Sequence, residues 1–325
     1  MKKILSLVLI LAVVLAMVLP LAVSAGPGDI GGSFGATNEA PVAGTITSSS
    51  PMTPYAQWST ITVPVSDANT IADINQVQVT FFYDIDKNSH TPPSAAAATC
   101  AIFTWTRTGG FVLTGPTSTT WAINAGGCGK PDDTATSGSW VFSFKVGKVA
   151  TATTGSSGWD IYAVATDGSN ATSNNHLYDQ VMNWYGEVSS SSPTLDWGSP
   201  ALGSGFAADT NKINNIPVTY ISNGNYAEKV KSAANWTGTN SQTATFDATG
   251  VCSSTNSFSL KACRTDAFGS VSQVDTTGVI IDNSSGTQTT ETPDAVGTNT
   301  LWLKIASSFT KATYSGNVTY IIASR

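Results

Sequence analysis

Residues 140–146 read Trp140-Val141-Phe142-Ser143-Phe144-Lys145-Val146, and this stretch decides the fold class. Side chains alternate in direction along a β-strand, so the four apolar residues at even-numbered positions share one face. The other face carries the polar Ser143 and Lys145 beside Val141. A segment with one strongly apolar face has to bury it against a second layer of structure. The stretch therefore predicts a strand of a layered β-protein.

Similar runs occur on both sides of this stretch. Each is short, rich in β-branched or aromatic residues, and bounded by Gly, Pro, Asn or Asp. No window carries a helical period of useful length. We expect further strands at 61–65, 77–83, 101–106, 111–113 and 159–166, a last strand of the same layer pair at 181–185, and then strands at 194–197, 215–222, 244–247, 257–262, 279–282, 301–305 and 317–322. The fold class is all-β, and the faces predict two packed sandwiches.

The 325 residues are enough for two ordinary domains. A Gly-rich stretch without periodicity follows the N-terminus, and Ser189-Ser190-Ser191-Ser192-Pro193 has the composition of a linker. The predicted organisation is a signal peptide at 1–25, a flexible leader at 26–40, a β-sandwich at 41–188, a linker at 189–193 and a second β-sandwich at 194–325.

The N-terminus has the features of an export signal. Lys2 and Lys3 precede an apolar run from Ile4 to Val23, and small residues follow at Ser24 and Ala25. These are the basic, apolar and cleavage regions of a secretory signal peptide. The alternative is an uncleaved anchor, because the apolar run is long enough to span a bilayer. Pro20 and the small-residue exit favour cleavage, so we expect an extracellular or cell-surface protein.

Composition limits the partners. Only 11% of residues are charged, against about 25% in average domains, and the net charge is −6. A nucleic-acid backbone needs a basic stripe, and an anionic membrane needs clustered Lys and Arg, neither of which the sequence contains. We therefore expect no nucleic-acid partner and no membrane insertion after signal cleavage. The expected partners are other copies of the chain, other surface proteins, or glycans.

The four cysteines allow three pairings. Export permits disulfides, and pairing within each predicted domain is the simplest arrangement. We predict the bridges Cys100–Cys128 and Cys252–Cys263. Each would stabilise its domain by about 3 kcal/mol through loop closure.

One segment has the spacing of a calcium-binding loop. Asp84, Asp86 and Asn88 alternate in the order that places oxygen ligands around calcium. The rest of such a loop is absent, since Ser89 takes the place of the turn glycine and Ala95 that of the bidentate Glu. The two interpretations are a calcium site and a polar turn after a strand, and the second is preferred. No other cofactor is expected.

The sequence shows no catalytic constellation. Both histidines, His90 and His176, have the surroundings of solvated loop residues. The four glutamates each stand alone among small or polar residues, and a glycosidase would need two carboxylates to converge. We therefore predict that the protein is not an enzyme.

Three segments in each predicted domain carry a family resemblance: 65–69, 77–81 and 159–167 in the first, and 195–198, 218–225 and 314–320 in the second. They resemble segments of bacterial and archaeal cell-surface immunoglobulin-like domains. In the first domain, 65–69 with 77–81 resembles their opening hairpin. The segment 159–167 resembles their penultimate strand, with Tyr162 placed as a corner tyrosine. In the second, Leu195-Asp196-Trp197-Gly198 and the run 218–225 resemble immunoglobulin-like surface domains, and 314–320 is similar to the final strand of WxL-type surface domains. The resemblance implies two tandem immunoglobulin-like β-sandwiches at a cell surface.

These observations favour a secreted or cell-surface structural or adhesive protein that acts by assembly or contact through its sandwiches. The alternative is a non-catalytic carbohydrate-binding or cell-wall-binding protein, for which exposed tryptophans would form an aromatic platform. A hydrolase is the third choice. The tryptophans with polar neighbours, which we expect to include exposed ones, are Trp58, Trp105, Trp121, Trp236 and Trp302.

Overall fold

The computed structural model describes residues 33–191, 194–281, 286–291 and 295–325, and residues 39–325 form one compact unit. The predicted signal peptide and the first part of the predicted leader lie outside the described residues. Among those described, no helix is long and apolar enough to cross a membrane. Strands dominate, and the helical elements are single turns of 3-10 helix: η1 Ile71–Asp73, η2 Ala125–Gly127 and η3 Phe268–Ser270. The all-β prediction is confirmed.

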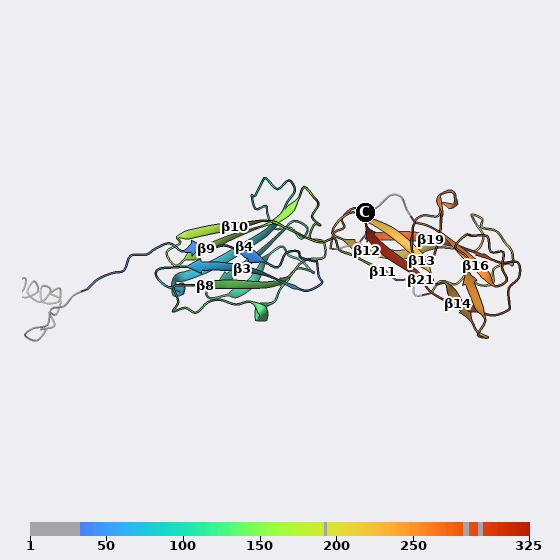
Figure 1. Cartoon of the computed structure of the whole chain (residues 1–325), viewed down its shortest axis with the longest axis horizontal. Helices are drawn as coiled ribbons and strands as arrows, with labels where there is room; N and C mark the ends of the chain where they lie inside the picture. Colours follow the sequence, from blue (N-terminus) through green and yellow to red (C-terminus); the bar gives the residue numbers. More distant parts are fainter. Residues whose placement is uncertain (1–32, 192–193, 282–285, 292–294) are drawn as a thin grey trace, which may run out of the picture. The chain divides into compact units, whose positions relative to one another are not determined.

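Two antiparallel sheets form the first part of the fold (Figure 1). One has the order β1-β3-β8-β7, with β2 also paired to β3, and the other has the order β10-β9-β4-β5-β6. The strands of the first sheet are β1 Val42–Ala43, β2 Thr47–Ser48, β3 Trp58–Ser66, β7 Ala122–Ile123 and β8 Ser137–Lys145. Those of the second are β4 Ile74–Asp84, β5 Cys100–Thr106, β6 Gly110–Gly115, β9 Gly158–Asp167 and β10 Thr172–Gln180.

Aromatic side chains fill the space between these two sheets. The alternation predicted for 140–146 is confirmed, because Trp140, Phe142, Phe144 and Val146 are all fully buried. Phe144 on β8 contacts Phe103 on the opposite sheet, with ring centroids 4.6 Å apart. Each side chain of this size buries enough apolar area to stabilise the fold by several kcal/mol.

Two further sheets follow along the chain. The larger has the order β11-β12-β19-β16-β15-β14-β20, with β17 also paired to β16, and the smaller has the order β18-β13-β21. The pairing of β15 with β16 is parallel, whereas the others are antiparallel. The strands of the larger sheet are β11 Gly186–Ser190, β12 Lys212–Ser222, β14 Asn235–Gly238, β15 Thr243–Phe246, β16 Ser257–Cys263, β17 Ser272–Gln273, β19 Ala295–Ile305 and β20 Tyr314–Ser315. Those of the smaller are β13 Tyr226–Ser232, β18 Val279–Ile280 and β21 Val318–Ser324.

A second cluster of buried apolar side chains lies between these sheets. Tyr220 on β12 and Tyr226 on β13 meet across it, with ring centroids 5.5 Å apart. Leu260 and Leu301 contribute from the paired strands β16 and β19. The chain therefore has two separate apolar cores, as the alternating faces predicted.

Several predicted boundaries differ from the structure. The predicted linker begins inside β11, because Ser189 and Ser190 pair with Thr219 and Val218 of β12. The segment 181–185 is not a strand, and its Met182 forms one isolated bridge with Met52. Residues 194–197 are irregular, and Trp197 packs on the side of the second core.

The sequence did not predict strands β10 and β13, because both contain polar residues that are uncommon in strands. Strand β10 carries two asparagines and an aspartate, which strands usually disfavour. In β13 the charged Glu228 occupies an inward position that would normally be apolar, so the alternation is disguised.

The predicted opening hairpin is also wrong. Strands β3 and β4 belong to different sheets, so the segment 66–73 crosses from one layer to the other. Tyr162, the residue placed as a corner tyrosine, lies on β9 and packs against His176 of the neighbouring strand β10, with ring centroids 4.5 Å apart.

All four cysteines are free thiols, contrary to the predicted bridges. Cys252 Sγ lies 3.8 Å from the carbonyl oxygen of Lys304 on β19. Cys263 lies opposite Thr300 of the same strand, four residues before Lys304. Four strand residues span about 13 Å, whereas bridged Cα atoms lie within about 7 Å.

The other predicted pair is divided between layers. Cys100 lies on β5 next to the inward-facing Ala101, so its side chain points away from the core, and its thiol contacts the Pro93 carbonyl oxygen at 3.4 Å. Cys128 contacts Ser143 on β8 of the other sheet. Burial raises the pKa of the Cys100 thiol, and likewise that of Cys252, to about 11, which keeps both in the unreactive protonated form.

Candidate functional site

The predicted calcium residues divide into two groups. Asp86 and Asn88 bond to each other within the turn, through Asn88 N to Asp86 Oδ1 at 3.0 Å and Asn88 Nδ2 to Asp86 O at 2.8 Å. This is the hydrogen bonding of a polar turn. Asp84 is the last residue of β4, and its buried carboxylate meets residues from elsewhere in the chain.

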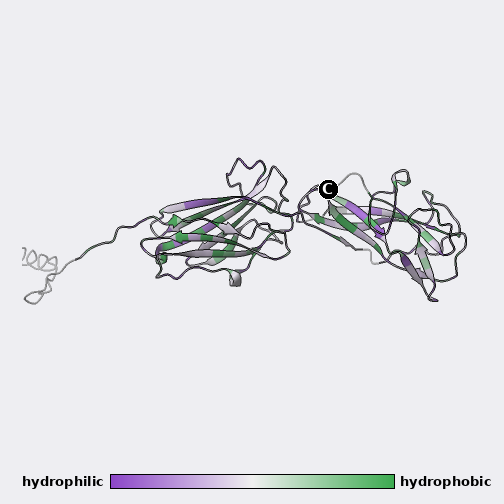
Figure 2. Ribbon diagram, in the orientation of Figure 1, coloured by the Kyte–Doolittle hydropathy of each residue, from purple (hydrophilic) through white to green (hydrophobic). Residues whose placement is uncertain are grey.

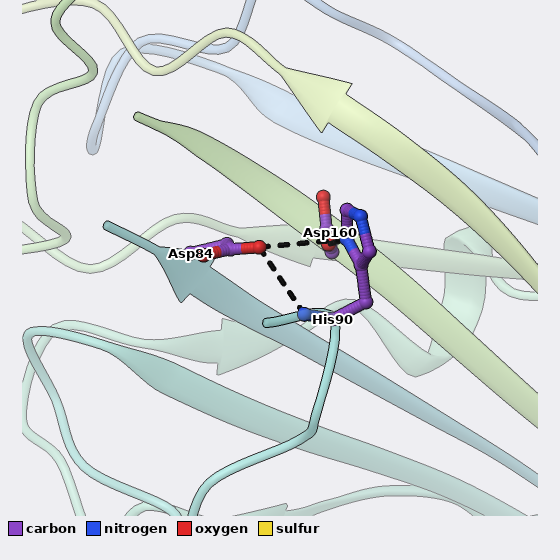
Figure 3. A group of neighbouring side chains, drawn as sticks. All are labelled: Asp84, His90 and Asp160. Atoms are coloured by element: carbon purple, nitrogen blue, oxygen red, sulfur yellow. Dashed lines mark hydrogen bonds and ion pairs between the residues drawn. The ribbon is translucent and has the colours of Figure 1, made fainter. Parts of the chain in front are cut away.

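Asp84, His90 and Asp160 converge from β4, the loop that follows it, and β9 (Figure 3). His90 Nδ1 lies 2.7 Å from Asp160 Oδ2 and 3.4 Å from Asp84 Oδ2. The His90 backbone N–H also donates to Asp84 Oδ2 at 3.2 Å, which holds this residue at a φ of 44°. His90 lies in the predicted loop with its side chain 35% exposed, but it is also anchored on two buried carboxylates, which the sequence did not predict.

Electrostatics explain why the histidine binds here. The hydrogen bond to Asp160 raises the pKa of His90, and the charges of Asp160, Asp84 and Asp179 add to that effect. Burial works against ionisation of Asp84, but hydrogen bonds from the backbone of His90 and Asp86 lower its pKa overall. When it is protonated, His90 places a positive charge beside two buried carboxylates.

The second histidine lies in a strand, not in a loop. His176 is on β10, and its ring lies 4.5 Å from that of Tyr162 and 5.4 Å from that of Tyr178. Burial lowers the pKa of His176, so the two histidines are shifted in opposite directions.

We expect two histidine resonances in a ¹H NMR titration, one with a pKa above the usual 6.5 and one below it. The His90→Gln variant should lose the resonance with the higher pKa. Because the folded pKa of His90 is raised, its stabilising contribution is complete below pH 6.5 and is lost as pH rises through the folded value. Loss of the lower resonance in His90→Gln would contradict the assignment.

A His–Asp pair can act as a general base where a substrate can reach it. A separate cavity of about 400 Å³ lies beside the second core. It is formed by the irregular segment after β11, the strands β14, β15, β16 and β19, and the segment that leads into β20. None of Asp84, His90 and Asp160 lines it.

Aromatic rings form the walls of this cavity. Trp197 and Trp236 line it with ring centroids 6.1 Å apart, and Phe309 and Tyr314 meet edge to face at 5.0 Å. The Tyr314 hydroxyl is fixed by donating to the Thr310 carbonyl oxygen at 2.9 Å. A Cβ at position 316 would lie within 2.5 Å of the Trp236 ring, so Gly316 allows this ring its position.

Both tryptophans at the cavity have an unsatisfied donor. The indole nitrogens of Trp197 and Trp236 are buried, and neither has a hydrogen-bond partner among the described residues. Buried Trp N–H groups usually find a partner. The polar residues at the cavity are Asp196, Ser199, Thr310, Lys311 and Thr313.

The sequence singled out one of these two tryptophans. Trp236 is 9% exposed and lines the cavity, whereas Trp105, Trp121 and Trp302 are buried. Trp58 is exposed at 46%, on β3. Trp197 was noted only within a resemblance, because its contact with Trp236 depends on segments distant in sequence.

One carboxylate and a few other polar groups lie among the aromatic walls of the cavity. Asp196 is the single carboxylate among the described residues that line it, and it accepts a hydrogen bond from Gly198 N at 2.7 Å. Hydrolysis of a glycosidic bond requires a pair of carboxylates. An apolar cavity with a few polar groups at its rim is the usual form of a small-molecule site.

Comparison with known proteins adds little. No family model and no curated protein matches the chain. Among solved structures, the sporulation control protein Spo0M from Bacillus subtilis matches with 12% identity and a TM-score of 0.26, over 45% of this chain and 50% of that one. The match therefore spans half the length of Spo0M.

Proposed function

We propose that this chain is an exported, non-catalytic β-sandwich protein of the cell surface or extracellular space that binds carbohydrate in the 400 Å³ cavity. The observation that carries the proposal is the aromatic lining of this cavity, in which the rings of Trp197 and Trp236 meet with their centroids 6.1 Å apart. Export is supported by the N-terminal sequence pattern.

The chemistry of a sugar matches this lining. A pyranose ring has an apolar C–H face, which packs on aromatic rings, and a hydroxyl edge, which accepts and donates hydrogen bonds. Trp197 and Trp236 offer aromatic ring surface for the C–H face. Asp196 and Lys311 at the same cavity supply an acceptor and a charged donor for hydroxyl groups.

An immunoglobulin-like type for the first sandwich is part of the proposal. Its sheet orders β1-β3-β8-β7 and β10-β9-β4-β5-β6 correspond to the orders ABED and GFCC′C″ of a variable-type immunoglobulin sandwich. The expected cell-surface setting agrees with such a sandwich, but the cavity carries the binding function.

Assembly through sheet edges is the weaker candidate. The edge strands β1, β7, β18 and β20 are two residues long. Edge strand β10 is hydrophilic (Figure 2) and has a register shift between Leu177 and Gln180, and both features discourage strand addition. The longer edge strands β6, β11 and β21 are the ones on which self-association would rest.

Screening the purified protein on a glycan array should yield a bound glycan, and calorimetry with that glycan should then give its affinity. We expect Trp197→Ala to weaken binding at least about 10-fold, equivalent to about 1.4 kcal/mol, because a stacking ring is lost. Incubation with the glycan should release no shorter product.

Trp58→Ala is the matched control, since it removes an exposed tryptophan from β3 and should leave binding unchanged. An array without any bound glycan, or equal affinity of the Trp197→Ala variant, would count against the proposal. Concentration-dependent filaments in negative-stain micrographs would favour assembly instead.

A further inference from the structure

Three aspartates meet at one end of the first sandwich. Asp67 follows β3, Asp73 ends η1 just before β4, and Asp167 is the last residue of β9. One carboxylate oxygen of each lies within 4.8 Å of those of the other two. Strand β3 belongs to one sheet, whereas β4 and β9 belong to the other, so the group joins both layers.

Two of these carboxylates have an oxygen without a partner. Asp67 is only 1% exposed, and its Oδ1 accepts a hydrogen bond from Asn69 N at 2.7 Å, but its Oδ2 is buried without any hydrogen bond. Asp73 Oδ2 is likewise buried and unbonded. An unpaired buried carboxylate oxygen is costly, so it calls for a ligand.

Among the described residues, the cation beside this group forms its hydrogen bonds outside the group. Arg107 is the cation beside Asp73 in the fold, but its hydrogen bonds go to the carbonyl oxygens of Ile71 and Ile74 and to Asp133. The guanidinium therefore fixes the backbone on both sides of Asp73.

The backbone around the group is shaped for close approach. Asp167 Oδ1 accepts hydrogen bonds from Ser169 N at 2.9 Å and Ala171 N at 2.8 Å, which orients its carboxylate. Gly168 N donates to the Asp73 carbonyl oxygen at 2.8 Å, and a Cβ at position 168 would lie 3.1 Å from Asp73 Oδ1. The glycine thus lets the η1 end and the β9 end come together.

We propose that Asp67, Asp73 and Asp167 bind a calcium ion that ties the two sheets of the first sandwich together. Calcium takes six to eight oxygen ligands in flexible geometry, and carboxylates supply one or two each. Magnesium requires a near-ideal octahedron and keeps much of its water, so three converging carboxylates favour calcium. The site is separate from the group of Asp84, His90 and Asp160, where the histidine provides the counter-charge.

The test is calorimetric titration of CaCl₂ into EDTA-treated, dialysed protein, together with thermal unfolding in calcium, in magnesium and in neither. We expect one binding event with calcium. At about 100-fold excess over the dissociation constant, the unfolding midpoint should rise by about 5–10 °C. Asp67→Asn keeps the shape and removes one charge, so it should weaken calcium binding at least about 10-fold and abolish the rise.

Asp73→Asn, at a half-buried position, provides a second variant if Asp67→Asn does not fold. Asp84→Asn is the matched control, since it removes a carboxylate from the other acidic group and should keep the calcium response. Absence of calcium binding by the original protein would overturn the proposal, as would full binding by Asp67→Asn and Asp73→Asn. Loss of binding in Asp84→Asn with retention in Asp67→Asn would also overturn it, by moving the site.

Discussion

Replacing Trp159 with alanine is expected to lower the free energy of unfolding by about 3–5 kcal/mol, one of the two largest effects we predict. Trp159 is fully buried on β9. Its ring lies 4.6 Å from that of Phe81 and 6.2 Å from that of Trp121, and its Nε1 donates to the Thr151 carbonyl oxygen at 2.8 Å. The substitution would open a cavity among these rings and leave the Thr151 carbonyl unpaired.

Urea unfolding followed by circular dichroism measures this loss, with the denaturant slope checked for each variant. Trp58→Ala is the control, because that side chain is 46% exposed and its removal should cost far less. Similar costs for the two variants would contradict the placement of Trp159 at the centre of the first core.

Replacing Arg264 with methionine is expected to cost about 3–5 kcal/mol, because it would leave a buried carboxylate without its cation. Glu228 on β13 is 2% exposed, and its Oε1 lies 3.3 Å from Arg264 Nε. A methionine keeps much of the apolar stem of arginine but carries no charge. The second core would then enclose an uncompensated charge.

The double variant Arg264→Met with Glu228→Gln should recover much of that stability, since it removes both charges together. Lys212→Met is the matched control: its ion pairs with Asp209 and Asp266 are solvated, so its loss should cost far less than that of Arg264. A double variant no more stable than Arg264→Met alone would contradict the assigned pairing.

Strand positions were predictable where both the alternation and the composition were strong. The runs around Trp140 and Trp159 lie in β8 and β9, and their alternate residues are buried as expected. The sequence did not predict strand β13 because Glu228 occupies a buried position in it. Glu228 is stabilised there by Arg264, which follows β16 and is distant in sequence. Local propensity cannot report a contact that only the assembled fold provides.

The candidate sites also divide into residues that the sequence indicated and groups that only the fold brings together. Asp84-x-Asp86-x-Asn88 had the spacing of a calcium loop, but the structure uses Asp86 and Asn88 within a turn. The group that we propose for calcium comes from three strand ends, and no spacing in the sequence links them. Trp197 and Trp236 likewise meet only because a segment after β11 folds beside β14.

The sequence by itself determined the all-β class and the two apolar cores, because side-chain alternation is a local property of each strand. Tertiary structure alone decided which strands share a sheet, that the four cysteines lie apart, and which carboxylates and rings converge. The physical reason is that these features depend on distances between residues remote in sequence, which are set by how the layers pack. Burial then determines how much these contacts contribute to stability, since an unpaired charge or donor is costly only where water is excluded.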